Sequence, residues 1–265
     1  MNNIVIGRYL PLDSLIHRRD PRFKILSMMI LLIAIFLPAG FQGYGILAIF
    51  AFFAYSLSKL PFNFIWKAFK PMLFMMGFIL VLNIMLNQEG DLVFAIWRIK
   101  IYSQALYHTG YIIVRLLLML TITTILTAST KPMDLTYAIE DLMAPLQVFK
   151  VPSHEIAMII SIALRFIPTL IEEAVRIMKA QSSRGVDFEQ GKLKEKIKGI
   201  LSLIIPLFVA SFKRAEDLAN AMEARGYVVE AKRTRYRQFK INLGDWLMLI
   251  MTGLVVTGII FLMIL

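Results

Sequence analysis

Five long apolar runs constrain this chain more than any other feature of its sequence. Each has 16 to 20 residues, close to the roughly 20 that a helix needs to cross a hydrocarbon core about 30 Å thick. The runs are continuous rather than alternating, which favours helices over a membrane β-barrel. Hydrophobic residues make up 58% of the 265 residues, against about 45–50% in a soluble domain. We therefore expect an all-α membrane protein with spans at Phe23–Pro38, Phe41–Leu57, Pro71–Leu86, Tyr111–Thr127 and Trp246–Leu265.

Basic residues are distributed unevenly around these runs. The N-terminal segment through Lys24 at the start of the first run, the link after the second run and the stretch 128–244 together hold 26 of the 29 Lys and Arg residues. Because Lys and Arg accumulate in cytoplasmic loops, we expect a cytoplasmic N-terminus and an extracellular C-terminus in the cell membrane. Arg115 lies just inside the fourth run, and we expect its guanidinium to extend to the outer lipid head groups.

The sequence offers little from which a catalytic or metal site can be built. It has no cysteine, so thiolate metal ligands and a Cys nucleophile are excluded. Its three histidines, His17, His108 and His154, are too far apart for a helical zinc motif. Gly191-Lys192 lacks the upstream glycine of a phosphate-binding P-loop. We expect no enzyme activity, no metal and no cofactor bound by this chain.

The sequence gives less support to two other classes of membrane protein. An intramembrane enzyme would depend on Asp134, Glu140, Asp141 and His154, whose spacing matches no metal or phosphate motif. A stand-alone secondary transporter would show two related halves with broken helices, whereas the repetition in this sequence lies between the fourth and fifth apolar runs.

That stretch, residues 128–244, is too long for a loop without structure of its own. It contains two apolar runs, Ile156–Leu170 and Ile197–Phe212, each shorter than the roughly 20 residues that a membrane-spanning helix needs. Each run is followed by a charged, amphipathic helical pattern. We expect a cytoplasmic or interfacial coupling domain of long amphipathic helices. Insertion of either run into the bilayer stays open as an alternative.

Both helical patterns end in the same way, at Ser183-Arg184-Gly185 and at Ala224-Arg225-Gly226. Glycine after a helix adopts the left-handed conformation without steric cost, and arginine there complements the helix dipole, so an ordinary helix end explains each motif alone. Their recurrence 41 residues apart, each after an Ile-Pro pair, indicates a duplicated device. An arginine at a narrow helix tip can bind a groove on another protein through paired hydrogen bonds. Two tips predict two grooves, hence a dimeric or pseudo-dimeric partner.

These motifs resemble those of the transmembrane T component of energy-coupling factor transporters, ABC-type importers of vitamins and metal ions. The resemblance covers nearly the whole chain. Ala224-Arg225-Gly226 matches the family motif fully, and Ser183 replaces alanine in the first motif. The other similar segments are Leu164-Arg165-Phe166-Ile167-Pro168, Glu172-Glu173, Ala180-Gln181, Tyr9, Asp13-Ser14, His17 and Asp20-Pro21-Arg22-Phe23-Lys24.

The resemblance implies a non-catalytic scaffold subunit. Two cytoplasmic ATPases, which themselves bind ATP and Mg²⁺, would dock on Ser183, Arg184, Gly185, Ala224, Arg225 and Gly226. The coupling helices would be supported by Arg165, Pro168, Glu172, Glu173 and Pro206. A membrane-embedded S component that captures the substrate would pack on Leu170, Ala174, Ile177, Met178, Leu218 and Met222.

The same resemblance sets expectations for the substrate and for the division of the chain. We expect vitamin uptake, with a dedicated cobalt or nickel system as the alternative. The partners are then two ATPases, an S component and the lipid bilayer, and no nucleic acid. The chain divides into 1–127 with four spans, the coupling domain 128–244, and the last span at 245–265.

Overall fold

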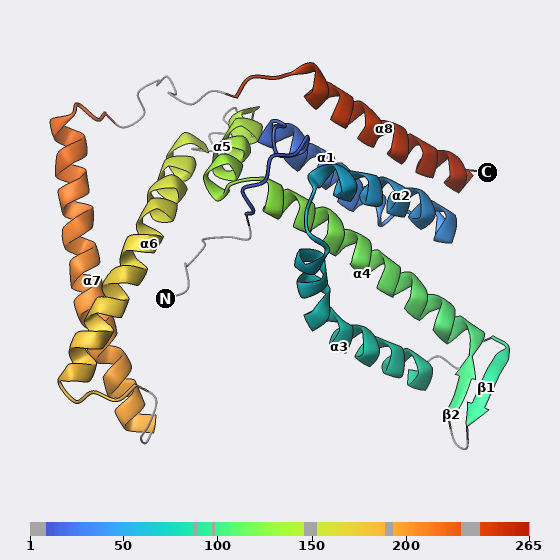
Figure 1. Cartoon of the computed structure of the whole chain (residues 1–265), viewed down its shortest axis with the longest axis horizontal. Helices are drawn as coiled ribbons and strands as arrows, with labels where there is room; N and C mark the ends of the chain where they lie inside the picture. The colour runs from blue at the N-terminus through green and yellow to red at the C-terminus, as the bar shows by residue number, and fades with distance from the viewer. Residues whose placement is uncertain are drawn as a thin grey trace. The chain divides into compact units, whose positions relative to one another are not determined.

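The chain forms two compact units, which we call the membrane unit and the coupling unit. The coupling unit is residues 154–238 and holds α6 and α7, and the membrane unit holds the other helices and a hairpin (Figure 1). The division places α5 (Pro132–Met143) with the membrane unit, whereas the sequence led us to begin the coupling domain at residue 128. The computed structural model describes residues 9–86, 90–96, 99–145, 153–188, 193–228 and 239–264.

Within the described part of the chain, four helices are long and apolar enough to cross a membrane. This confirms an all-α membrane fold with several spans. Each of the four contains one of the predicted apolar runs, apart from the terminal Leu265, which lies outside the described residues. The helices are α2 (Gly40–Ser58), α3 (Phe62–Leu86), α4 (Ser103–Ser129) and α8 (Leu243–Ile264).

The first predicted span forms a shorter helix, α1 (Pro21–Ala34). Its 14 residues reach about 21 Å at 1.5 Å per residue, less than the about 30 Å of a hydrocarbon core. The helix begins where the Asp20 carboxylate accepts a hydrogen bond from the Arg22 backbone N–H at 2.9 Å, with Pro21 in the first turn. Isolated turns continue to Leu37, and Pro38 then prevents the helix from extending into α2.

The packed core of the membrane unit lies where α1, α2, α4 and α8 meet. Leu31, Ile35, Leu47, Ile122 and Ile259 are buried there. Lipid tails are as apolar as these side chains, so the helices are held by close packing and by specific polar contacts more than by exclusion of water.

Several helix ends gather at one end of the membrane unit, which we call its N-terminal end (Figure 1). The backbone N–H of Leu10 donates to the carbonyl of Ala128 at the end of α4, at 3.0 Å. The N–H of Asp20 donates to Asp245 at the start of α8, at 3.1 Å. Leu60, just after α2, packs against Ala128. The hairpin and the last turn of α8 lie at the opposite end (Figure 1).

Three features of the α3–α4 region were not anticipated, and one is that α4 begins at Ser103, eight residues before the predicted run. The helix α3 begins at Phe62 and runs through Pro71, which we had placed at the start of the span. The link that follows contains an antiparallel hairpin, β1 (Leu92–Ile96) and β2 (Ile99–Tyr102). A two-stranded hairpin without a sheet around it is marginal alone, and β2 here contacts both α3 and α4.

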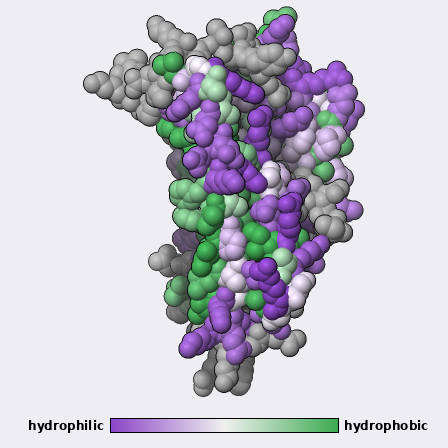
Figure 2. Space-filling view, turned by 90° about the vertical axis from the view of Figure 1, so that its left-hand side faces the viewer, coloured by the Kyte–Doolittle hydropathy of each residue, from purple (hydrophilic) through white to green (hydrophobic). Residues whose placement is uncertain are grey.

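The coupling unit is a pair of long helices that cross, α6 (Ser153–Ser183) and α7 (Leu193–Ala224) (Figure 1). The Gln181 side-chain amide donates to the Ser202 carbonyl at 3.4 Å, and the Arg214 guanidinium lies 5.9 Å from the centre of the Phe166 ring. Over the described residues neither helix meets the criteria of a span. Figure 2 views the molecule from the left-hand side of Figure 1, where α7 is labelled. A hydrophobic band lies on this surface beside hydrophilic residues.

Candidate docking site

Both coupling helices end in the same backbone geometry. Gly185 and Gly226 have φ values of +87° and +74°, which confirms the left-handed conformation predicted for them. Each end makes the two hydrogen bonds of a Schellman motif, in which the residue after the glycine bonds five residues back and the glycine three residues back. These bonds are Val186 N–H to Gln181 O (3.1 Å), Gly185 N–H to Ser182 O (3.0 Å), Tyr227 N–H to Met222 O (3.0 Å) and Gly226 N–H to Glu223 O (2.8 Å).

The arginine before each glycine is exposed. Arg184 and Arg225 occupy the position directly after the last helical residue, and neither side chain has a hydrogen bond or ion pair within the described part of the chain. Each guanidinium therefore offers five N–H donors in a fixed planar fork. It lies at the negative end of the helix dipole, where a positive charge is favoured.

The first tip, Ser183-Arg184-Gly185, is braced by α7. Beyond Gly185 the chain turns back on α7, and a Cβ added at Gly199 would lie 3.4 Å from both the Asp187 carbonyl and the Val186 side chain. Distances of 3.4 Å are van der Waals contacts, so this turn packs directly against Gly199 of α7. Gly199 and Gln181 thus make the contacts between the first tip and α7, a role that the sequence analysis did not assign to either residue. A glycine within a helical pattern was the available signal.

The residues predicted to support the coupling helices lie along α6 and α7, away from the tips. Pro168 and Pro206 are inside the two helices, where each removes one backbone hydrogen bond. Arg165 and Glu172 are exposed. Glu173 forms an ion pair with Arg176 at 3.6 Å. With the Arg176 side chain 75% exposed, this pair contributes little to stability.

The apolar residues predicted to contact an S component are only partly accessible. Leu170, Ala174, Ile177, Leu218 and Met222 are half-buried, and Met178 is 37% exposed. The larger unpartnered surface lies nearer the start of α7, at helical spacing, with side chains 48–62% exposed. We call it the α7 stripe, and it consists of Ile197, Ile200, Leu201, Ile204, Ile205, Phe208, Val209 and Phe212.

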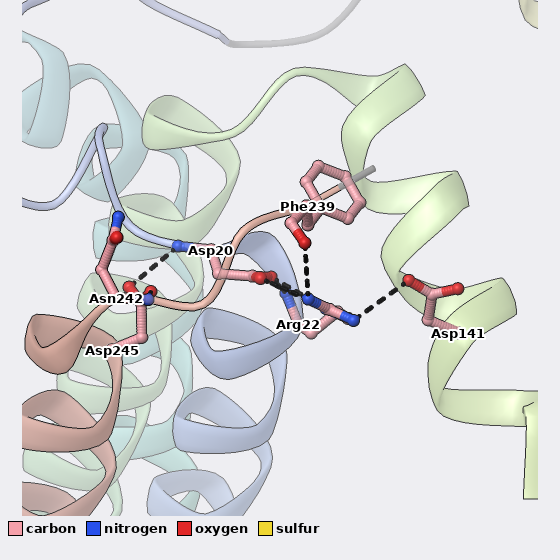
Figure 3. A network of polar contacts seen from close by, with 6 residues as sticks. All are labelled: Asp20, Arg22, Asp141, Phe239, Asn242 and Asp245. Atoms are coloured by element: carbon pink, nitrogen blue, oxygen red, sulfur yellow. Dashed lines mark hydrogen bonds and ion pairs between the residues drawn. The ribbon is translucent and has the colours of Figure 1, made fainter. Parts of the chain in front are cut away.

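A polar network at the N-terminal end of the membrane unit surrounds Arg22 (Figure 3). Its guanidinium bonds Asp20 through Nε and Nη2, the latter at 2.7 Å, and Nη1 lies 3.4 Å from Asp141 of α5. Nη2 also donates to the Phe239 carbonyl at 3.4 Å. Asp141 precedes the coupling unit in the sequence and Phe239 follows it. Arg22 therefore ties together, within the membrane unit, the two segments between which the coupling helices are inserted.

The rest of the family-like N-terminal segment is also held by polar contacts. The Lys24 ammonium donates to the carbonyls of His17 (3.3 Å) and Ser129 (3.0 Å) and to the Thr130 hydroxyl (3.3 Å). The His17 ring bonds the Ser14 hydroxyl at 2.7 Å and the Leu10 carbonyl at 3.0 Å. Burial, aided by the Lys24 charge, lowers the pKa of His17 below its usual value. The His17 ring is therefore neutral near pH 7.

Arg115, which we expected to extend to the outer head groups, makes contacts within the protein. Its Nε donates to the Tyr44 hydroxyl at 2.7 Å, and its guanidinium lies 5.2 Å from the Phe36 ring centre and 5.1 Å from that of Tyr111. These three aromatic residues come from α2, α4 and the turn after α1, so cation–π contacts hold the charge between elements of the protein.

The described residues contain no group of three or more His, Asp or Glu side chains arranged to hold a metal ion. Of the acidic residues weighed for an enzyme, Asp141 forms an ion pair with Arg22 at 3.4 Å. The side chain of His154, which was also weighed for an enzyme, lies outside what the structure describes. What the geometry defines is a multi-pass helical membrane protein carrying two arginine-tipped helices.

Comparison with known proteins places this architecture in a family. A family model described as cobalt transport protein, CbiQ, matches residues 13–236. The chain is 44% identical over 238 residues to the energy-coupling factor transporter transmembrane protein EcfT of Bacillus subtilis, covering 90% of each protein. It is 44% identical to that of Macrococcus caseolyticus (94% of each) and 42% identical to that of Streptococcus thermophilus (94% and 95%). The chain belongs to this family of energy-coupling factor transporter transmembrane proteins, and the resemblance drawn from its motifs is confirmed.

Proposed function

We propose that this chain is the scaffold subunit of an energy-coupling factor importer and that its two arginine tips dock on two cytoplasmic ATPase subunits. The observation that carries the proposal is the pair of matching helix ends, each presenting an exposed arginine in the same Schellman geometry. A partner with two equivalent grooves can recognise both ends by the same hydrogen bonds.

The crossing of α6 and α7 supports a role in coupling. Contacts join the helices at Gln181–Ser202 and at Phe166–Arg214. A partner that moves one tip therefore displaces the other helix as well. ATP hydrolysis in the docked subunits would in this way change the relative position of the two apolar helix faces.

We propose that the membrane-embedded S component packs on these faces, and on the α7 stripe in particular. A stripe of eight large apolar side chains, each 48–62% exposed, needs a protein or lipid surface to cover it. The residues predicted from the sequence, such as Leu218 and Met222, continue it toward the second tip with less exposure.

The orientation proposed for this assembly has the N-terminus and the coupling unit in the cytoplasm and the C-terminus outside. It places 26 of 29 basic residues on the cytoplasmic side. It also agrees with the location of the last turn of α8 at the end of the membrane unit opposite residues 9–20 (Figure 1).

For the substrate we propose vitamins or a similar micronutrient, selected by the S component. The names of the EcfT relatives specify no metal. A cobalt or nickel system is the second candidate, because the description of the matching family model names cobalt.

Docking is tested by co-purification from membranes. The double variant Arg184→Glu with Arg225→Glu should lose both ATPases and remain in the membrane. Losing one partner of a desolvated charge pair costs about 2–5 kcal/mol, so each single variant should weaken assembly. The double variant Arg176→Glu with Lys179→Glu changes the same net charge at exposed positions of α6 and should keep both ATPases. Retention of the ATPases by the tip variant would disprove docking through these arginines.

The S-component surface is tested separately. Phe208→Ser with Phe212→Ser removes the two aromatic rings of the α7 stripe, whose centres are 4.6 Å apart. This variant should release the S component and keep the ATPases. Lys213→Ser with Glu216→Ser, at exposed polar positions beside the stripe, is the matched control and should release neither partner. Equal S-component recovery from both variants would rule out this stripe.

A further inference from the structure

A cavity of about 360 Å³ lies among α1, α2, α4 and α8. The same four helices close tightly around Ile35, Leu47 and Ile259 nearer the hairpin end of the membrane unit. The cavity lies toward the N-terminal end, and most of its wall is hydrocarbon or thioether from side chains such as Met28, Leu31, Phe50, Ala54, Met248 and Met251.

The rim of the cavity is accessible. Leu15, Phe53 and Leu247 line it and are 53–60% exposed. Phe53 and Leu247 belong to spanning helices, so they face lipid. A hydrocarbon chain can therefore enter the cavity from the bilayer, and an apolar space of this kind is not filled by water.

The wall of the cavity nearest residues 9–20 carries two basic side chains, Arg19 and Lys24, and no acidic one from the described part of the chain. Asp20, Asp134 and Asp245 lie close enough to Lys24 to interact with its charge. Arg19 lines this wall, half-buried, and its side chain has no acceptor among the residues that the structure describes. Its guanidinium lies directly on Gly244, where a Cβ would overlap it. The Lys24 ammonium, in a residue only 5% exposed, adds a second positive charge, although all three of its protons are donated to protein oxygens.

One more polar atom marks the same wall. The Ser27 hydroxyl lines the cavity, its residue is 6% exposed, and it has no hydrogen-bond partner. A buried hydroxyl without a partner costs free energy that a ligand oxygen would recover. The site thus combines an unpaired guanidinium, an unsatisfied hydroxyl and an apolar space open to the bilayer.

We propose that this cavity binds an anionic phospholipid, with the phosphate against Arg19, an ester or phosphate oxygen accepting from Ser27, and one acyl chain among the four helices. Basic pockets between transmembrane helices are suited to anionic head groups. The lipid would fill the gap that the helices leave at the end of the membrane unit that contains the Arg22 network.

The test measures lipids retained by the full-length chain, purified with its co-purifying partners and equilibrated in micelles of equal phosphatidylglycerol and phosphatidylcholine. After washing in lipid-free detergent, mass spectrometry should find phosphatidylglycerol enriched about fivefold. Arg19→Gln should abolish the enrichment. Ala54→Phe, which fills the cavity, should lower the total retained lipid. Arg18→Gln removes an adjacent arginine that is exposed and paired with Asp13, and it should behave as the wild type.

Thermal unfolding keeps the test valid if a variant folds poorly. Phosphatidylglycerol should raise the melting temperature of the wild type and of Arg18→Gln, and not that of Arg19→Gln. Inorganic phosphate alone should not raise it. Equal stabilisation by inorganic phosphate would overturn the acyl-chain part of the proposal. An absence of preference in the wild type, or unchanged retention by both Arg19→Gln and Ala54→Phe, would overturn the site itself.

Discussion

Arg22 shows how one side chain can hold several segments of a membrane protein. Its fork bonds the 1% exposed Asp20 side chain and also reaches Asp141 and the Phe239 carbonyl. A lysine there keeps the charge and cannot reproduce the paired geometry. We therefore expect Arg22→Lys to destabilise the membrane unit by about 1–3 kcal/mol, the cost of leaving a charged partner unsatisfied.

The measurement is thermal unfolding in detergent. Arg18→Lys is the control, because the Arg18–Asp13 pair is 71% and 73% exposed and such pairs contribute about 0–1 kcal/mol. Equal melting temperatures for the two variants would show that the Arg22 network does not hold the segments together.

His17 predicts a dependence of stability on pH. Its folded-state pKa is lowered by burial, so the unfolded chain binds a proton more readily below about pH 6.5. The contribution of His17 is complete above that pH and is lost as the pH falls toward the folded pKa. Melting temperatures at pH 8 and pH 5.5 should differ less for His17→Gln than for the wild type. A larger or equal difference in the variant would assign the dependence to other groups.

At the scale of the helix, the glycine after each arginine sets the direction of the tip. Gly226 has φ of +74° and a Cβ there would meet no atom within 4 Å, so the penalty for alanine is conformational, about 1–2 kcal/mol. We expect Gly226→Ala to reorient Arg225 and reduce ATPase capture. Gly226→Asn should retain capture, because asparagine tolerates the left-handed conformation. Identical capture by the two variants would mean that the tip geometry is unimportant.

Element boundaries show which features the sequence reports well. The apolar runs located α2, α8 and the C-terminal two thirds of α4 because lipid demands continuous apolar residues, and the Arg-Gly pairs located the ends of α6 and α7. The early starts of α3 at Phe62 and of α4 at Ser103 and the hairpin were missed. Pro71 removes a single hydrogen bond from a helix that neighbouring contacts sustain. The strands have only five and four residues, too few for a long pattern to reveal them.

For the whole molecule, the prediction is a topology with the two termini on opposite sides of the membrane. A reporter protein fused after Leu265 should be active outside the cell, and one fused to the N-terminus should be active in the cytoplasm. The physical reason is the asymmetry of basic residues. A cytoplasmic reporter at the C-terminus would mean that the number of crossings is even, with the 14-residue α1 failing to cross as the simplest cause.

Composition, periodicity and local motifs by themselves determined the membrane class, the long amphipathic helices and their glycine-terminated tips, because each depends on residues close together in the chain. Tertiary structure alone decided the contacts between distant residues. It placed Arg115 among three aromatic rings, joined Arg22 to Asp141 and Phe239, and left an apolar cavity with Arg19 in its wall between four helices. Such contacts depend on how helices pack in three dimensions, and a linear pattern carries no record of which side chains will meet.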